Sequence, residues 1–157
     1  MQFLVEMDEN LLNLRFLEAE SRIVPRSIYF AHPVNTYGTD LEGMLLEKMG
    51  AGIMDAVENP NQEHHQENYQ IWKAETGRGM DYFERLLNSP KIGGAIILPF
   101  EDGKIGAGVY REAEVAGSNH KTVFEINHDG LVNHFKFDDA RKLSIEETRE
   151  RVYQNQS

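Results

Sequence analysis

The sequence predicts an α/β fold of the Rossmann-like three-layer type, in which helices cover both faces of a central parallel sheet. Three compact apolar runs, rich in β-branched and aromatic residues, lie at residues 27–31, 94–99 and 121–126. Such runs are typical of strands buried on both faces. Amphipathic helical patterns separate them, and alternating strands and helices indicate βαβ units with right-handed crossovers.

Residues 1–26 are expected to form an N-terminal extension of the main domain. MQFLV has the composition of a short strand. Residues 8–20 (DENLLNLRFLEAE) fit either a helix or a hairpin strand, because their apolar positions follow neither period cleanly. Pro25 is expected to end this segment.

Two helices and a long loop are predicted between the first and second of these strands. The first helix covers residues 41–57 and is capped by Thr39 or Asp40, with Ile53 near the end of its apolar face. Residues 58–79 are polar and irregular, as in a lid or binding loop. A second helix is expected over residues 79–90, where Pro90 closes it.

The C-terminal half continues the alternation. A third helix is predicted at residues 109–119 and is stopped by Gly117. Ser144 and Glu147 have the spacing of a capping box, which predicts a terminal helix within residues 141–157. With 157 residues the chain fits one domain, residues 1–157.

The net charge of −10 excludes some classes of partner. Duplex nucleic acid needs clustered Lys and Arg, and an anionic membrane surface attracts basic segments. No apolar run approaches the ~20 residues of a membrane span, and the acidic N-terminus is unlike a signal peptide. There is no cysteine, hence no disulfide or thiolate metal site. We expect a cytoplasmic protein with a small-molecule partner and no cofactor.

A metal site is not expected either. His64 and His65 are adjacent, and neighbouring residues on a helix do not share a face. Glu63 and Glu67 flank the pair without the HExxH spacing of known zinc sites.

Three loops leave the carboxyl ends of the predicted strands, where parallel sheets bind their ligands. The loop after residue 31 offers His32, Asn35 and Tyr37 as substrate-binding candidates. A loop His hydrogen-bonded to nearby backbone is an equally good interpretation of His32. The loop after the third strand leads into residues 131–135 (LVNHF), an apolar-polar stretch suited to contact with a second copy of the chain.

The loop after the second strand is the most informative. It contains Asp102 and then places Gly106 and Gly108 just before a helix N-terminus, where free N–H groups and the helix dipole favour an anion or polar ligand. Glu112 follows one turn into that helix, where its carboxylate could face the ligand crevice. In the alternative interpretation, the glycines only make a turn and Glu112 is a solvated acid.

These segments together resemble the nucleoside 2-deoxyribosyltransferase superfamily, especially small members of archaeal or viral type and the related nucleotide N-glycosidases. The resemblance covers roughly residues 27–128. The motifs that carry it are IYFAHPVNTYGT, GMDYF and GAIILPFEDGKIGAGVYREAEVA followed by TVFEI. It implies an oligomeric enzyme that acts on the N-glycosidic bond of a nucleoside or nucleotide.

The resemblance also implies roles for particular residues. Glu112, four residues before Ala116, matches the nucleophile; Asp81, at the start of the preceding helix, matches an Asp that helps hold the base; and Tyr29 matches a tyrosine that positions the nucleophile. Asn133 would reach the sugar pocket of a neighbouring subunit. The chain departs from the pattern at Gly106, where transferases of the group carry an Asp.

The residue types suit that chemistry. Breaking an N-glycosidic bond passes through an oxocarbenium-like state, which a carboxylate such as that of Glu112 can stabilise or trap as a glycosyl ester. A second acid, for which Asp81 and Asp102 are candidates, would protonate the departing base. A free base in the leaving-group pocket gives transfer, and water gives hydrolysis. Two alternatives are a non-catalytic module that senses or sequesters a nucleotide-derived ligand and a purely structural component of an oligomer.

Overall fold

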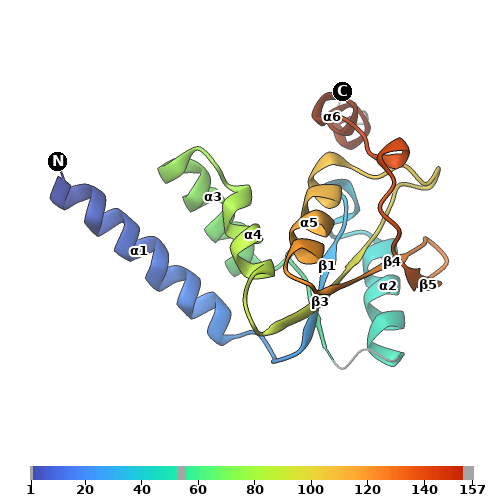
Figure 1. Cartoon of the computed structure of the whole chain (residues 1–157), viewed down its shortest axis with the longest axis horizontal. Coiled ribbons are helices and arrows are strands. Elements are labelled where there is room, and N and C mark those ends of the chain that lie inside the picture. The colour runs from blue at the N-terminus through green and yellow to red at the C-terminus, as the bar shows by residue number, and fades with distance from the viewer. Residues whose placement is uncertain (1, 53–55, 154–157) are drawn as a thin grey trace.

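A five-stranded sheet of order β2-β1-β3-β4-β5 forms the centre of the molecule (Figure 1). The strands are β1 (Ser27–Ala31), β2 (Val57–Glu58), β3 (Ile92–Ile97), β4 (Thr122–Ile126) and β5 (Val132–His134). The first four are parallel and only β5 is antiparallel, to β4. The computed structural model describes residues 2–52 and 56–153, with side chains from residue 9 onward. The predicted α/β fold with a mostly parallel central sheet is confirmed.

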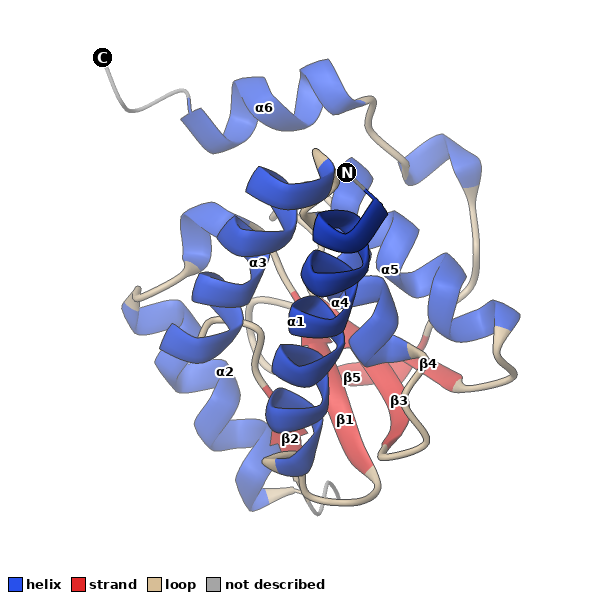
Figure 2. Ribbon diagram, turned by 90° about the vertical axis from the view of Figure 1, so that its left-hand side faces the viewer, coloured by secondary structure: helices blue, strands red, loops and turns tan. Residues whose placement is uncertain are grey.

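Helices cover both faces of this sheet (Figure 2). They are α1 (Gln2–Ser21), α2 (Asp40–Ala51), α3 (Glu63–Thr76), α4 (Met80–Leu87), α5 (Ala107–Ser118) and α6 (Ile145–Tyr153), with short 3₁₀ turns η1 (Val34–Thr36) and η2 (Asp139–Arg141). None of the helices in the described part of the chain has the length and hydrophobicity of a membrane span.

The side-chain alternation of the strands divides the core into two layers. On β1, Phe30 faces the layer that α2 covers through Leu45 and Met49. Tyr29, one residue earlier, faces the opposite layer, which α1, α3, α4 and α5 fill. Successive side chains of a strand point to opposite faces, so a single strand supplies both cores.

The N-terminal segment departs from the prediction. Residues 2–5 of the predicted strand are helical, because residues 2–21 form the single helix α1. Phe16, Ala19 and Ile23 are buried in the large core, whereas Leu14 is 63% exposed. The apolar residues of α1 therefore lie on more than one side of the helix, which blurred its periodicity in the sequence.

Between β1 and β3, the predicted helix over residues 41–57 and the predicted loop over residues 58–79 are partly wrong. α2 ends at Ala51, and Val57, predicted as helical, lies in β2. Ile53 lies outside the described residues. The stretch predicted as a long loop contains α3. Its buried residues, His65, Asn68 and Trp72, have helical spacing, but two of them are polar, so a search for apolar periodicity passes over them.

The C-terminal half follows the prediction more closely. α4 and α5 lie where helices are expected, although Gly117 is inside α5 rather than beyond its end. The capping box is present: the Glu147 amide donates to Oγ of Ser144 at 3.0 Å, and the Ser144 amide donates to Oε1 of Glu147 at 3.1 Å. The turn after β4 leads into β5, an edge strand that the sequence analysis does not predict.

Candidate functional site

A cavity of about 330 Å³ lies at the carboxyl ends of β1 and β3. From β1 the chain turns to β2 on one side and later returns to β3 on the other, so the loops that follow these two strands diverge at this point. Parallel sheets bind ligands at such a switch point. Six of the residues singled out in the sequence line this cavity: Tyr29, His32, Tyr37, Gly106, Gly108 and Glu112.

Tyr29 and Glu112 meet at the floor of the cavity. Tyr29 points from β1 towards α5, whose Ala113 and Ala116 are buried and small enough to let the helix pack closely on the sheet. Glu112 is only 6% exposed, and the Tyr29 hydroxyl donates a hydrogen bond to its Oε2. Glu112 is therefore not the solvated helix-face acid of the alternative interpretation.

Burial controls the charge of this carboxyl group. The pKa of Glu112 is raised to about 8, mainly because burial removes the solvation of the charged form. The hydrogen bond from Tyr29 lowers this pKa, and the charge of Glu84 raises it. Burial, followed by the proximity of Glu112, also raises the pKa of the Tyr29 hydroxyl well above its usual value. At neutral pH most molecules thus carry a protonated carboxyl group at position 112.

Tyr37, which directly follows η1, places a second hydroxyl group near the Glu112 carboxyl group. Its pKa is raised, first by burial and then by the proximity of Glu112 and Glu42. The hydroxyl is consequently a neutral donor and acceptor over the physiological range. The two tyrosines give the polar end of the cavity groups that can bind sugar hydroxyls without adding charge.

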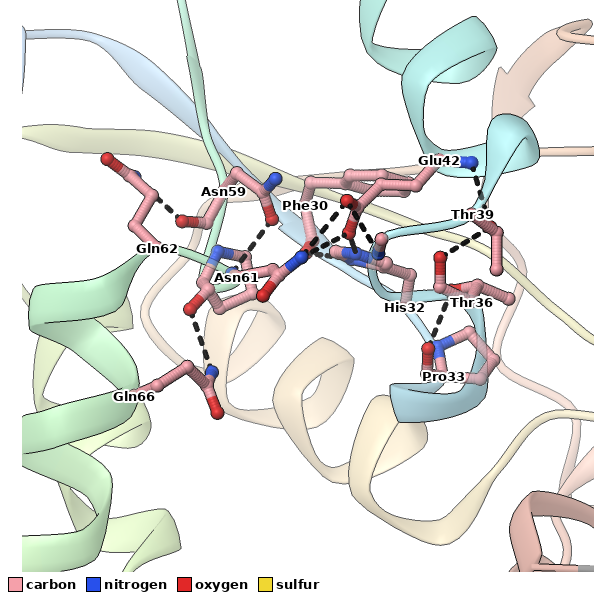
Figure 3. Close-up of polar contacts among 12 residues, drawn as sticks. Phe30, His32, Pro33, Thr36, Thr39, Glu42, Asn59, Asn61, Gln62 and Gln66 are labelled. Atoms are coloured by element: carbon pink, nitrogen blue, oxygen red, sulfur yellow. Dashed lines mark hydrogen bonds and ion pairs between the residues drawn. The ribbon is translucent and has the colours of Figure 1, made fainter. Parts of the chain in front are cut away.

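His32 forms part of a buried network beside the cavity (Figure 3). Its Nδ1 lies 2.8 Å from the Phe30 carbonyl, and its Nε2 lies 2.7 Å from Oε2 of Glu42. The Asn61 amide and the Gly38 backbone N–H also donate to Glu42. Burial lowers the pKa of His32, although Glu42 opposes this effect.

This network fixes what His32 can offer to a ligand. Both ring nitrogens are occupied, so only the face and edge of the imidazole are left towards the cavity. Burial alone would raise the pKa of Glu42, but hydrogen bonds from His32, Gly38 and Asn61 lower it overall. The interpretation of His32 as a loop His bonded to nearby backbone therefore describes its contacts, and its ring still lines the cavity.

The terminal helix α6 contributes Thr148, Val152 and Tyr153 to the lining of the cavity. Oγ1 of Thr148 accepts a hydrogen bond from the Ala107 amide at 2.9 Å and so caps α5. A Cβ on Gly106 would lie 3.2 Å from Cγ2 of Thr148, so the glycine permits this close approach. Arg151 forms two hydrogen bonds with Asp102, at 2.7 and 2.8 Å.

Four of the predicted site residues lie outside the cavity. Asp81 is paired with Arg78 at 3.4 Å. Asn35 and Asp102 line a separate, open groove next to the cavity. Asn133 is exposed on β5, opposite Glu125 of β4, because the chain turns back antiparallel after β4 instead of ending at the cavity.

The cavity also contains residues that the sequence analysis does not assign to a site. Tyr69, Phe83 and Phe100 give it aromatic walls, Lys73 is a cation at its edge, and α6 adds Val152. Tyr69 and Lys73 come from α3, which was predicted as a loop. Their spacing of four residues is a helical signal, but the polar residues around them hide it.

Comparisons of the chain with models of protein families, with curated proteins and with solved structures found no match.

Proposed function

We propose that the cavity binds a nucleoside or nucleoside monophosphate and that Glu112 attacks or stabilises the anomeric carbon during cleavage or transfer of the N-glycosidic bond. The observation that carries the proposal is the buried Glu112 carboxyl group, oriented by Tyr29 inside a cavity with aromatic walls. The resemblance to nucleoside 2-deoxyribosyltransferases supports the same assignment.

The shape and chemistry of the cavity suit a molecule with one flat ring and one hydroxylated ring. Aromatic side chains such as Phe100 and Tyr69 can pack against a base. The hydroxyl groups of Tyr29 and Tyr37 lie near Glu112, where a sugar would be held. An ionised Glu112 beneath the anomeric carbon would stabilise the positive charge that develops as the base departs.

The nucleophile must be ionised, although the pKa of Glu112 is about 8. The ionised fraction therefore rises with pH through this value. A nucleophilic Glu112 predicts that the rate of base release rises with pH up to about 8. A Glu112 that donates a proton to the base predicts the opposite slope.

One observation favours a second candidate, a nucleotide-binding module without catalysis. Among the described residues, Glu112 is the only carboxyl group that lines the cavity, and Asp81 and Asp102 are both paired with arginines elsewhere. Two-carboxylate schemes need an acid for the leaving group. Without one, the base would have to receive its proton from solvent.

A base-release assay tests the proposal. The purified chain is incubated with a panel of nucleosides and nucleoside monophosphates, with and without an added free base, and the products are separated by chromatography. We expect release or exchange of base by the wild type and a loss of several orders of magnitude in Glu112→Gln, which keeps the shape but loses the nucleophile.

The matched control is Glu114→Gln on the same helix. Glu114 is half-buried and lies 3.8 Å from Lys142, outside the cavity, so this variant should keep full activity. Binding is measured in parallel by calorimetry. Tight binding with no turnover of any substrate would show that the module without catalysis is the correct function, and equal activity of both variants would remove Glu112 from the mechanism.

We also propose that the chain forms a homo-oligomer through β5. All three residues of this edge strand are exposed, and Leu131 and Val132 are 64% and 38% exposed. An unpaired strand edge with apolar side chains favours pairing with a second copy. Light scattering at micromolar concentration tests this proposal, and a monomer would contradict it.

A further inference from the structure

Two histidines and a glutamate meet at the start of α3, outside the cavity. Glu58 ends β2, and His64 and His65 lie in the first turn of α3. One ligand atom from each of the three residues lies within 4.8 Å of the other two. His65 is completely buried and Glu58 is 8% exposed. Glu58, which comes from another element, is the third member of this cluster beside the two adjacent histidines.

His64 has an unused nitrogen in this cluster. Its Nε2 is the one buried side-chain nitrogen or oxygen in the described chain that has no hydrogen-bond partner. Its ring lies against that of His65, with the centroids 4.0 Å apart. A buried polar atom without a partner is unfavourable, because it has lost its hydrogen bonds with water and gained none in the protein.

Hydrogen bonds already hold the other two residues. Nε2 of His65 lies 2.6 Å from Oε1 of Glu58, and Nδ1 of His65 lies 2.5 Å from the Tyr82 hydroxyl, to which Asn68 donates. Gln62 donates to the same Glu58 oxygen at 3.1 Å. Metal-bound imidazoles usually have their second nitrogen fixed by a hydrogen bond, as Tyr82 does for His65.

We propose that Glu58, His64 and His65 bind a divalent transition-metal ion of the Zn²⁺ type. Two imidazole nitrogens and one carboxylate oxygen match the ligand preference of such ions, whereas Mg²⁺ and Ca²⁺ prefer oxygen alone. For the ion to replace the hydrogen bond between His65 Nε2 and Glu58, the His65 proton moves from Nε2 to Nδ1, from which it is donated to the Tyr82 hydroxyl, and Nε2 becomes free to bind the ion.

The geometry needs adjustment at all three ligands. A tetrahedral zinc at about 2.0–2.2 Å from its ligands places neighbouring ligand atoms roughly 3.4 Å apart. Oε1 of Glu58 and Nε2 of His65, now 2.6 Å apart, would have to separate slightly, and the His64 nitrogen, which lies within 4.8 Å of the other ligand atoms, would have to approach the ion. His64 is half-buried, which lets its ring rotate and lets the ion enter from solvent.

Outside the cluster, Arg22 and Glu18 are charged residues that lie close enough to His64 to affect its electrostatics. Arg22, the nearby cation, is itself paired with Glu18 at 2.9 Å. A bound ion would join the end of β2 to the first turn of α3, the helix that supplies Tyr69 and Lys73 to the cavity.

Zn²⁺ binding to the full chain tests the proposal. Competition with a chromophoric chelator should show one Zn²⁺ per chain, no comparable binding of Mg²⁺, and a higher thermal unfolding temperature in the presence of Zn²⁺. His64→Ala should fold normally, because the buried Nε2 of His64 has no hydrogen-bond partner among the described residues, and should lower the affinity for Zn²⁺ at least about tenfold.

Two further variants make the result decisive. Glu58→Gln should also weaken Zn²⁺ binding, because it keeps the shape of the side chain but removes its charge. The matched control is His120→Asn, which removes an exposed histidine and tolerates the positive φ of 60° at that position. Equal Zn²⁺ affinity in wild type and His64→Ala, or a weakening in His120→Asn as large as in His64→Ala, would overturn the proposal.

Discussion

The Tyr29 hydroxyl of β1 donates a hydrogen bond to the buried Oε2 of Glu112 on α5. The two residues are 83 positions apart in the chain and join β1 to the helix that follows β3. Tyr29 orients the carboxyl group and favours its ionised form, while burial favours its protonated form. The balance between these two effects decides the chemistry that Glu112 can perform.

Tyr29→Phe should raise the pKa of Glu112 above its value of about 8, because the hydrogen bond that lowers this pKa is lost and the burial that raises it remains. The carbon-13 shift of the Glu112 carboxyl group, followed against pH, measures the change. The Glu114 signal serves as the internal reference, because Glu114 lies outside the cavity. A midpoint that falls in the variant would show that the Tyr29 hydroxyl does not stabilise the ionised form.

Glu112 should make the protein less stable as pH rises. Its pKa is raised from 4.5 to about 8 in the folded state, so between these values the folded state holds a proton that the unfolded state has lost. The free energy of unfolding therefore falls over this window, by about 1.4 kcal/mol for each unit of pKa shift. Urea unfolding at several pH values checks this.

The matched variant for that experiment is Glu112→Gln, which cannot titrate. Its stability relative to wild type should increase between pH 4.5 and 8 and stay constant below this window. Parallel pH profiles of the two proteins would mean that Glu112 is solvated rather than buried.

Two glycines at the start of α5 should respond differently to the same substitution. Gly106→Ala places a methyl group 3.2 Å from Thr148 and should displace α6, whereas the nearest atom to a methyl group on Gly108 is in Met80, 3.9 Å away. Amide hydrogen exchange should therefore quicken in α6 for Gly106→Ala only. Identical exchange in the two variants would contradict the close packing of α6 on Gly106.

Asp102→Asn should loosen α6 with little effect on the rest of the chain. The Arg151 hydrogen bonds lower the pKa of Asp102 to about 2, and both side chains are partly exposed. Exposed ion pairs contribute about 0–1 kcal/mol, so global stability should hardly change. Hydrogen exchange in α6 should quicken, and Glu18→Gln, which breaks another exposed pair with Arg22, should leave α6 unchanged. No change in either variant would mean that the Arg151 pair does not hold α6.

The strands and the C-terminal helices are determined locally. The run at 27–31 coincides with β1, which is buried along nearly all of its length and therefore reads as a compact apolar run. The run at 121–126 differs from β4 by one residue, although β4 is less completely buried. The Ser144 and Glu147 capping box likewise depends on neighbours three residues apart. For these elements the local pattern contains the information that the fold uses.

The sequence also determined which residue types follow each strand, and therefore that His32, Tyr37 and Glu112 belong to loops and helices near one edge of the sheet. Only the tertiary structure decided which of them meet. Asp102 turns away to pair with Arg151, and the chain reverses after β4, so Asn133 faces outward. Hydrogen bonds and reversals between distant segments leave no periodic signal in the chain.

Helix α3 illustrates most clearly the difference between what the sequence determines and what only the tertiary structure decides. Its sequence contains the polar residues His65 and Asn68, which indicate a surface when taken alone. In the folded chain, hydrogen bonds with Glu58, Tyr82 and Arg15 make it possible to bury them. Polar groups can be buried where partners satisfy them, and those partners come from β2, α4 and α1, which only the tertiary structure brings together.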